Sequence, residues 1–501
     1  MEPTNDAPQP QGEDRVLLPP GAYDPERYRV KYRANKKYIL SGFLAGVIIA
    51  VAGICLYVLR RQVTPSKSNT PVATQISPSV TLFYNDGKTV LWETKTPAKA
   101  DTDLPDKAPD FVYAVRDELR KTYGETYYMQ GAWEVTTTLD AVLQKHAEDA
   151  IAAQQAELTK RHVTSTTFIA EENSTGKVVS WVGDAAMSIQ PGGTIKPFVY
   201  AAQIEHSTNT GAGTKVDDTQ GPLDGYPCTN RNQPNVGGNC LLNYDWVYAG
   251  SMSLRYALGL QRNVPAVKSL ISVGVPTFMD TVKDLGVEHG YSCYADATKS
   301  EKATCYQASG LGDGAYLRFA DEVHAYGTLS NNGLKLPQTI ISKTILNGST
   351  KSEWKLSEGS RAVRPETAYI ISDILSDKNA SYLTGSLKDN FTAGSAKLGL
   401  ALGVTNTADA SNVVGFSSKY TAGFWAGNTE NKSLTTVMEV PVLSTWHSWM
   451  VAANNDPAFP ERTKPAGLQT LNAYILKTKV TRLGEVVPSP TTDLYPSWYK
   501  E

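Results

Sequence analysis

An uncharged stretch of 22 residues, Tyr38 to Leu59, constrains this chain more than any other feature of its sequence. A helix of that length crosses the apolar core of a bilayer. Basic residues cluster just before the stretch and only Arg60 and Arg61 follow closely, so the positive-inside rule places residues 1–37 in the cytoplasm. A cleaved signal peptide is the alternative, but the stretch is too long and no small-residue cleavage site follows it. We therefore expect a single-pass protein of the cell membrane whose main part is extracytoplasmic.

The composition is that of a globular protein, with 41% apolar and 20% charged residues among 501. The formal net charge is −2, which gives no support to a nucleic-acid partner. No glycine-rich phosphate loop occurs, so no cofactor is expected. The remaining partner classes are the membrane, a peptide or glycan ligand, and other proteins.

Shifts in composition divide the chain into segments. The Pro- and charge-rich start is typical of a disordered tail, and a Pro/Ser/Thr linker follows the apolar stretch. The expected segments are a cytoplasmic tail (1–37), a transmembrane helix (38–59), a linker (60–78), a membrane-proximal pedestal (79–165), a main α/β domain (166–480) and a C-terminal tail of loop (481–501).

Local patterns predict the first elements of the part beyond the linker. Two alternating apolar runs around Asn85-Asp86-Gly87 predict a hairpin, and Ser174-Thr175-Gly176 marks the turn of a second one. The predicted elements are a hairpin at 80–94, a helix at 110–124, a strand at 132–140, a helix with a buried face of Val142, Ala147, Ile151 and Leu158, and a hairpin at 166–184.

Four cysteines fall into two equally spaced pairs, Cys228 with Cys240 and Cys293 with Cys305. In an extracytoplasmic compartment each pair can close a short disulfide loop, although four free thiols remain an alternative. A zinc site is not expected, because no CxxC pair occurs. The six histidines have no partners at ligand or triad spacing, and we expect them to face solvent or to be capped.

A series of segments resembles the transpeptidase half of class A penicillin-binding proteins, in the family's order. The segments are "TFIAEENSTGKVVSWVGD", "QPGGTIKPFVYAAQIE", "LRYALGLQRNVPAVK", "GLGDGAYLRFADEVHAYGTLSNNG" and "TAGFWAGNTENK". The resemblance implies an α/β (α+β) fold of the serine β-lactamase type, with a five-stranded antiparallel sheet flanked by helices plus a helical lobe. The family's glycosyltransferase domain has no counterpart, because only about fifteen residues separate the hairpin at 80–94 from the helix at 110.

The family's chemistry needs a serine three residues before a lysine at the start of a helix, so that the lysine can take the serine proton. Here that motif is Gly193-Thr194-Ile195-Lys196, in which the base remains and the nucleophile is replaced by glycine. Thr194 lies roughly 200° around a helix from Lys196 and is not expected to substitute.

The other two family motifs have also lost their hydroxyl groups. Ser-x-Asn is matched by Gln261-Arg262-Asn263, which keeps only the amide that positions substrate. Lys-Thr-Gly is matched by Ala401-Leu402-Gly403 on spacing, with Lys397-Leu398-Gly399 as the alternative. With no nucleophile the covalent route is closed, so no catalytic residue is assigned.

The sequence therefore predicts a pseudoenzyme and leaves three functions open. The first is a catalytically silent scaffold or regulator that recruits cell-wall synthases. The second is a binding module that holds peptidoglycan stem peptide or another extended ligand in the emptied cleft. The third is a D,D-transpeptidase- or carboxypeptidase-type enzyme with non-covalent chemistry based on Lys196. The candidate substrate-binding residues are Lys196, Gln261, Asn263, Thr405 and Asn406.

Overall fold

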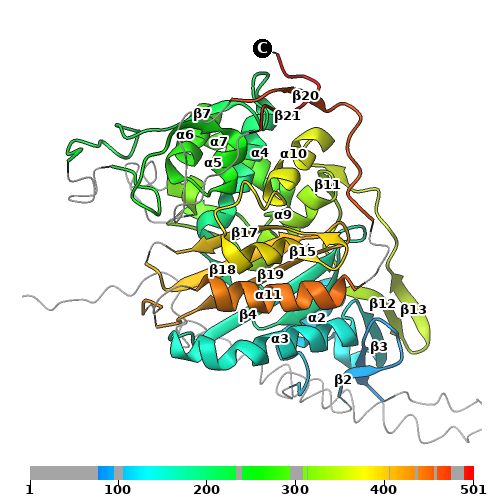
Figure 1. Ribbon diagram of the computed structural model, residues 1–501. Coiled ribbons are helices and arrows are strands. Elements are labelled where there is room, and N and C mark those ends of the chain that lie inside the picture. Colours follow the sequence, from blue (N-terminus) through cyan, green and yellow to red (C-terminus); the bar gives the residue numbers. More distant parts are fainter. Residues whose placement is uncertain are drawn as a thin grey trace, which may run out of the picture. The chain divides into compact units, whose positions relative to one another are not determined.

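The computed structural model (Figure 1) describes residues 77–94, 105–232, 240–293, 308–312, 314–405, 407–430, 432–434, 438–455, 460–474 and 490–500. The expected tail and transmembrane helix, most of the linker, Cys305 and Asn406 lie outside these residues. Among the residues that are described, no helix combines the length and the apolar character that a membrane crossing requires.

The main sheet has five antiparallel strands in the order β17-β18-β19-β4-β5, as the resemblance implied. The predicted hairpin at 166–184 is confirmed as the pairing of β4 with β5. The strands are β4 (Ser165–Glu172), β5 (Lys177–Val182), β17 (Gly399–Val404), β18 (Ala410–Phe416) and β19 (Tyr420–Gly427).

Helices cover both faces of this sheet because its strands are apolar on both sides. On one face Phe424 packs with α3 (Ala141–Lys160) and α11 (Glu439–Ala453), which lie side by side in Figure 1. On the other face Gly423 admits the Val323 side chain of α9 (Phe319–Ser330), at 2.4 Å from the position of a Cβ. Gly423→Phe would clash with Val323, and Phe424→Gly would leave a void beneath α3 and α11.

The face of α3 differs from the prediction at its first turn. Ala147, Ile151 and Leu158 are buried, whereas Val142, in the first turn of the helix, is 64% exposed. Gln144 is buried in its stead, and its amide exchanges two hydrogen bonds with the backbone of Trp181 on β5. A polar side chain thus covers the free edge of the sheet.

The helical lobe packs against α9 and carries the first two motifs. Its helices pack through apolar faces, and Gly274 caps the C-terminus of α6. The elements are α4 (Lys196–His206), α5 (Leu254–Gly259), α6 (Asn263–Val273), α7 (Val275–Leu285), α10 (Pro365–Leu375), β7 (Lys215–Asp218) and β8 (Gly250–Ser253).

A second five-stranded sheet, the pedestal sheet, has the order β13-β12-β3-β1-β2. The predicted hairpin at 80–94 forms β1 and β2, whereas β12 and β13 come from the middle of the expected main domain. The elements are β1 (Ser79–Phe83), β2 (Val90–Thr94), α2 (Pro109–Tyr123), β3 (Ala132–Thr137), β12 (Ile341–Leu346) and β13 (Ser349–Glu353).

Short strands join the remaining segments. They are β6 (Ser188–Ile189), β9 (Ser292–Cys293), β10 (Ala315–Arg318), β11 (Leu334–Lys335), β14 (Ser360–Arg361), β15 (Thr392–Ala393), β16 (Ala396–Lys397), β20 (Gln469–Asn472) and β21 (Thr492–Tyr495). The prediction that the last twenty residues form only loop is wrong, because β21 pairs with β20.

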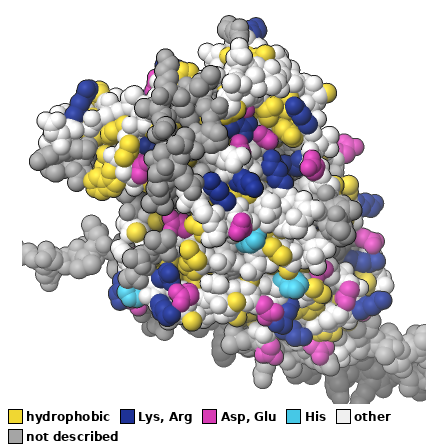
Figure 2. All heavy atoms as spheres, in the orientation of Figure 1, with side chains coloured by type: hydrophobic (Ala, Val, Ile, Leu, Met, Phe, Trp, Pro, Cys, Tyr) yellow, Lys and Arg dark blue, Asp and Glu magenta, His cyan; other side chains and the backbone are white. Residues whose placement is uncertain are grey.

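Basic and acidic side chains are interspersed over the face of the molecule that Figure 2 shows.

One buried arginine explains why β21 is ordered. Arg255 of α5 bonds both carboxylate oxygens of Asp493 on β21, at 2.6–3.1 Å, and also contacts Asp373 and Asp377 at the end of α10. Arg255 and Asp493 are both nearly inaccessible to solvent. Their pairing satisfies each charge, so the C-terminal strand is tied to the helical lobe.

We expect Arg255→Met to lower the free energy of unfolding by about 3–5 kcal/mol, because it leaves Asp493 buried and unpaired. Urea denaturation of the full chain measures this loss. Lys397→Met is the matched control, since Lys397 contacts Asp373 at 3.7 Å from an exposed position, and its loss should cost at most about 1 kcal/mol. Equal effects of the two substitutions would contradict the assignment.

Candidate functional site

The first motif lies on a tight turn that leads into α4. Residues Gly192–Ile195 form a short 3₁₀ helix, and Lys196 is the first residue of α4. Gly192 has φ +59°, and a Cβ there would meet the Val404 carbonyl oxygen at 2.5 Å. Glycine is required at this position because β17 runs directly against the turn.

The absent side chain at Gly193 is replaced by backbone from β17. A Cβ on Gly193 would lie 2.7 Å from the Leu402 carbonyl oxygen and 3.0 Å from Oε1 of Gln261. The first of these is closer than a real Cβ approaches backbone oxygen, so a side chain here would have to displace β17. The space between helix and strand is therefore closed at the position of the family's nucleophile.

The two candidate placements of the third motif differ in where the structure puts them. Leu402 on β17 lies next to Gly193, and Ala401 is buried beside it. Lys397 is on β16 with a half-exposed side chain that contacts Asp373. Thr405 holds the β17–β18 turn, donating to Asp409 Oδ1 at 2.6 Å and accepting from the Asp409 and Ala410 amides.

Lys196 joins the first two motifs. Its Nζ donates to the Gln261 carbonyl oxygen at 2.6 Å and to Asn263 Oδ1 at 2.7 Å. Burial, with the nearby Arg262 cation, lowers the pKa of Lys196 to about 7. A neutral amine still carries the two hydrogens that these bonds need, so both bonds can form whether or not the lysine is protonated.

The amide of Asn263 is also satisfied internally. Its Nδ2 donates to the Leu242 carbonyl oxygen at 2.8 Å, and its backbone amide donates to Asn243 Oδ1 at 2.8 Å. This segment directly follows the predicted disulfide Cys228–Cys240, which is present. A peptide carbonyl of the protein's own chain thus occupies the donor that the resemblance assigns to substrate.

Gln261 is the one motif residue with an unused polar group. Its Oε1 is buried without a hydrogen-bond partner among the described residues, and the residue adopts φ +53°. Glutamine at positive φ is uncommon and costs free energy. The Gln261 Oε1 lies 3.0 Å from where a Cβ on Gly193 would be.

A buried polar group beneath the turn was not anticipated from the sequence. Thr194 Oγ1 lies 2.5 Å from Glu322 Oε1 of α9 and donates to the Pro191 carbonyl at 2.7 Å, with the Asn412 amide 3.2 Å away. Burial raises the pKa of Glu322 to about 8. A protonated Glu322 can donate to Thr194, which leaves the threonine hydrogen for Pro191.

One histidine, His324, contradicts the expectation that all six are solvent-facing or capped, because it is buried with Nδ1 3.0 Å from Glu171 Oε2. His289 is exposed as expected, although its Nδ1 lies 3.0 Å from Asp321 Oδ2. Glu171 is over 150 residues away in the chain. Only the packing of α9 on β4 brings the buried pair together.

Curated relatives of the chain are penicillin-binding proteins, while no protein-family model matches it. It is 27% identical over 258 residues to penicillin-binding protein 1A/1B of Bacillus subtilis (strain 168), which covers 49% of this chain and 26% of the relative. It is 26% identical over 308 residues to penicillin-binding protein 1A of Streptococcus pneumoniae, which covers 57% and 39%. The chain thus spans between a quarter and two fifths of these relatives.

Solved structures agree on the fold. Penicillin-binding protein 1A of Haemophilus influenzae superimposes with a TM-score of 0.63 at 15% identity, covering 82% of this chain and 78% of that one. The fold is that of penicillin-binding protein transpeptidases. PonA1 of Mycobacterium tuberculosis gives 0.59 at 18% identity, covering 71% and 93%.

Glu322→Gln should remove a pH dependence of stability. In the wild type the folded state keeps a proton that the unfolded state loses above about pH 4.5, so stability falls as pH rises from about 4.5 to about 8. The glutamine variant should lack this fall. Urea denaturation across pH 5–9 measures it, and an unchanged fall in the variant would show that Glu322 ionises normally.

Proposed function

We propose that this chain is a membrane-anchored, catalytically silent transpeptidase-like protein that acts as a scaffold or regulator in peptidoglycan and cell-envelope assembly. Its similarity to penicillin-binding proteins supports the peptidoglycan-related role. The observation that carries the inactivity is the Leu402 carbonyl oxygen in the space of the nucleophile. The short stretch 95–108 between β2 and α2 leaves no room for a glycosyltransferase domain.

Internal hydrogen bonding in the former cleft also supports a non-catalytic role. Lys196 and Asn263 donate to Gln261, Asn263 and Leu242, so their N–H groups are already engaged within the protein and are not available to hold a substrate. An enzyme that keeps catalytic groups for its transition state presents them to the ligand. The intact fold around these residues is consistent with selection for a surface or a partner.

A second candidate is a binding module that holds an extended peptide. Its support is the unpartnered, buried Oε1 of Gln261, because a ligand amide could satisfy that acceptor. Binding would require the Leu242 segment to leave Asn263. Thermal-shift measurements with stem peptides and muropeptides distinguish the two candidates, since the scaffold predicts no shift at millimolar ligand.

We expect neither the wild type nor Gly193→Ser to form a covalent adduct with a fluorescent penicillin, measured by gel fluorescence and intact mass. The serine variant should also lose about 1–3 kcal/mol of stability, because its Cβ overlaps β17. Gly221→Ser is the control, since nothing lies within 4 Å of a Cβ at Gly221. A wild-type adduct would refute the pseudoenzyme, and an acylated, fully stable Gly193→Ser would refute the steric argument.

The scaffold role predicts stable protein partners. Purification of the full chain from cross-linked native membranes should enrich peptidoglycan synthases over a control membrane protein. Enrichment should persist in Lys196→Met, because the proposed role does not use the lysine chemically. Absence of any envelope-synthesis protein from the purified material would count against the scaffold.

A further inference from the structure

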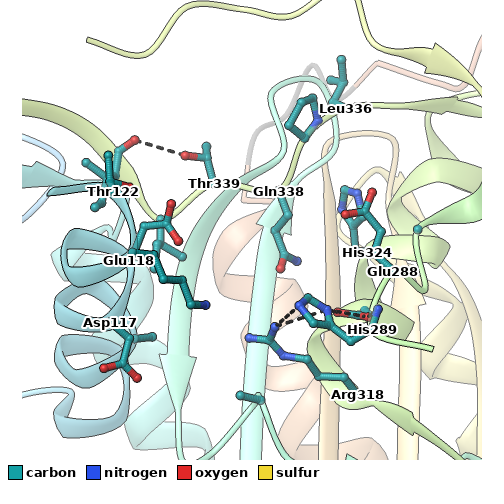
Figure 3. A pocket seen from close by; sticks show the side chains of 18 of the residues that line it. Asp117, Glu118, Thr122, Glu288, His289, Arg318, His324, Leu336, Gln338 and Thr339 are labelled. Atoms are coloured by element: carbon teal, nitrogen blue, oxygen red, sulfur yellow. Dashed lines mark hydrogen bonds and ion pairs between the residues drawn. The ribbon is translucent and has the colours of Figure 1, made fainter. Parts of the chain in front are cut away.

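A large cleft lies away from the three motifs, between the pedestal side of the molecule and the main sheet. Its volume is about 1120 Å³, which is ample for a ligand of several residues. Residues of α2, of β10 and the start of α9, and of the stretch 335–341 line it, and no motif residue does. Figure 3 shows α2 on one side of the cleft and His289 with Arg318 on the opposite side.

Charged side chains line both walls: Asp117, Glu118 and Lys121 on α2, and Glu288, Arg318, Asp321 and Lys335 on the other side. On α2, Asp117 and Glu118 are exposed, and Asp117 is paired with Arg120 at 2.7 Å. Glu118 has no ion-pair partner among the residues that the structure describes. The α2 wall therefore offers a carboxylate that is free to receive a cation.

Arg318 provides the opposite wall with a cation. Its Nη1 lies 3.2 Å from His289 Nε2, and its Nε is buried without a hydrogen-bond partner among the described residues. Asp321 forms no ion pair with Arg318 among the described residues; its carboxylate accepts from the His289 ring and backbone amide instead. Glu288 is likewise paired, with Lys335 at 3.1 Å. A guanidinium held in this way has donors left for a planar carboxylate.

We propose that this cleft is a binding site for a short zwitterionic peptide, with Arg318 receiving its carboxylate and Glu118 its ammonium group. The site is separate from the motif residues, and the inference holds whether or not the motifs are inactive.

Other ligand classes fit the cleft less well. A phosphate dianion would meet the carboxylates of Asp321 and Glu288 beside Arg318, which disfavours a second negative charge. Stacking on a sugar needs a free aromatic face, but Lys177 lies 3.9 Å over the Trp354 ring and Tyr123 packs on Trp133. The charge pattern is therefore the main determinant of the ligand.

Calorimetric titration of the full chain with tetra-alanine tests the proposal directly. The peptide with two free termini should bind, and its N-acetylated and C-amidated forms should each bind about tenfold more weakly, since each lacks one charge-assisted contact. This comparison uses the unaltered protein, so it does not depend on any variant folding. No binding of tetra-alanine at 10 mM, on the order of the weakest useful affinity, would overturn the proposal.

Two variants assign each terminus to its wall. Arg318→Gln should bind the amidated and free-acid peptides equally, and Glu118→Gln should bind the acetylated and free-amine peptides equally. Arg361→Gln and Glu125→Gln are matched controls outside the cleft lining, and they should keep both preferences. Equal binding of all three peptides to the wild type, or unchanged preferences in both cleft variants, would refute the assignment.

Discussion

The arrangement around Gly193 depends on backbone packing directly against backbone. The turn Gly192–Ile195 approaches β17 so closely that no side chain fits at Gly193. Since β17 is fixed by its pairing with β18 along its whole length, it cannot easily retreat. A serine at position 193 therefore requires β17 to shift, which its pairing with β18 opposes.

This packing also determines how the surviving motif groups are used. Lys196 keeps its place at the start of α4, but its hydrogen bonds end on Gln261 and Asn263. The segment at Leu242 completes the network from outside. Buried polar groups stabilise a fold when they are satisfied, so retained motif residues need not indicate retained catalysis.

The pedestal sheet helps to form the cleft lined by α2 and Arg318. β12 and β13 extend from the main domain to pair with β3, and the chain leading into them forms part of the cleft lined by α2 and Arg318. The segment that joins the two sheets therefore also lines the cleft between them. A ligand there would contact both parts and would leave the motif residues untouched.

The sequence alone determined the local elements and the residues at the motif positions. The hairpins around Gly87 and Gly176 follow from turn residues, and the glycine three residues before Lys196 is visible without coordinates. Tertiary structure decided which groups meet: the Leu402 carbonyl against Gly193, and β12 against β3. These contacts join residues about 200 positions apart. Periodicity and turn residues describe only short stretches of chain, so they do not indicate which distant segments will pack together.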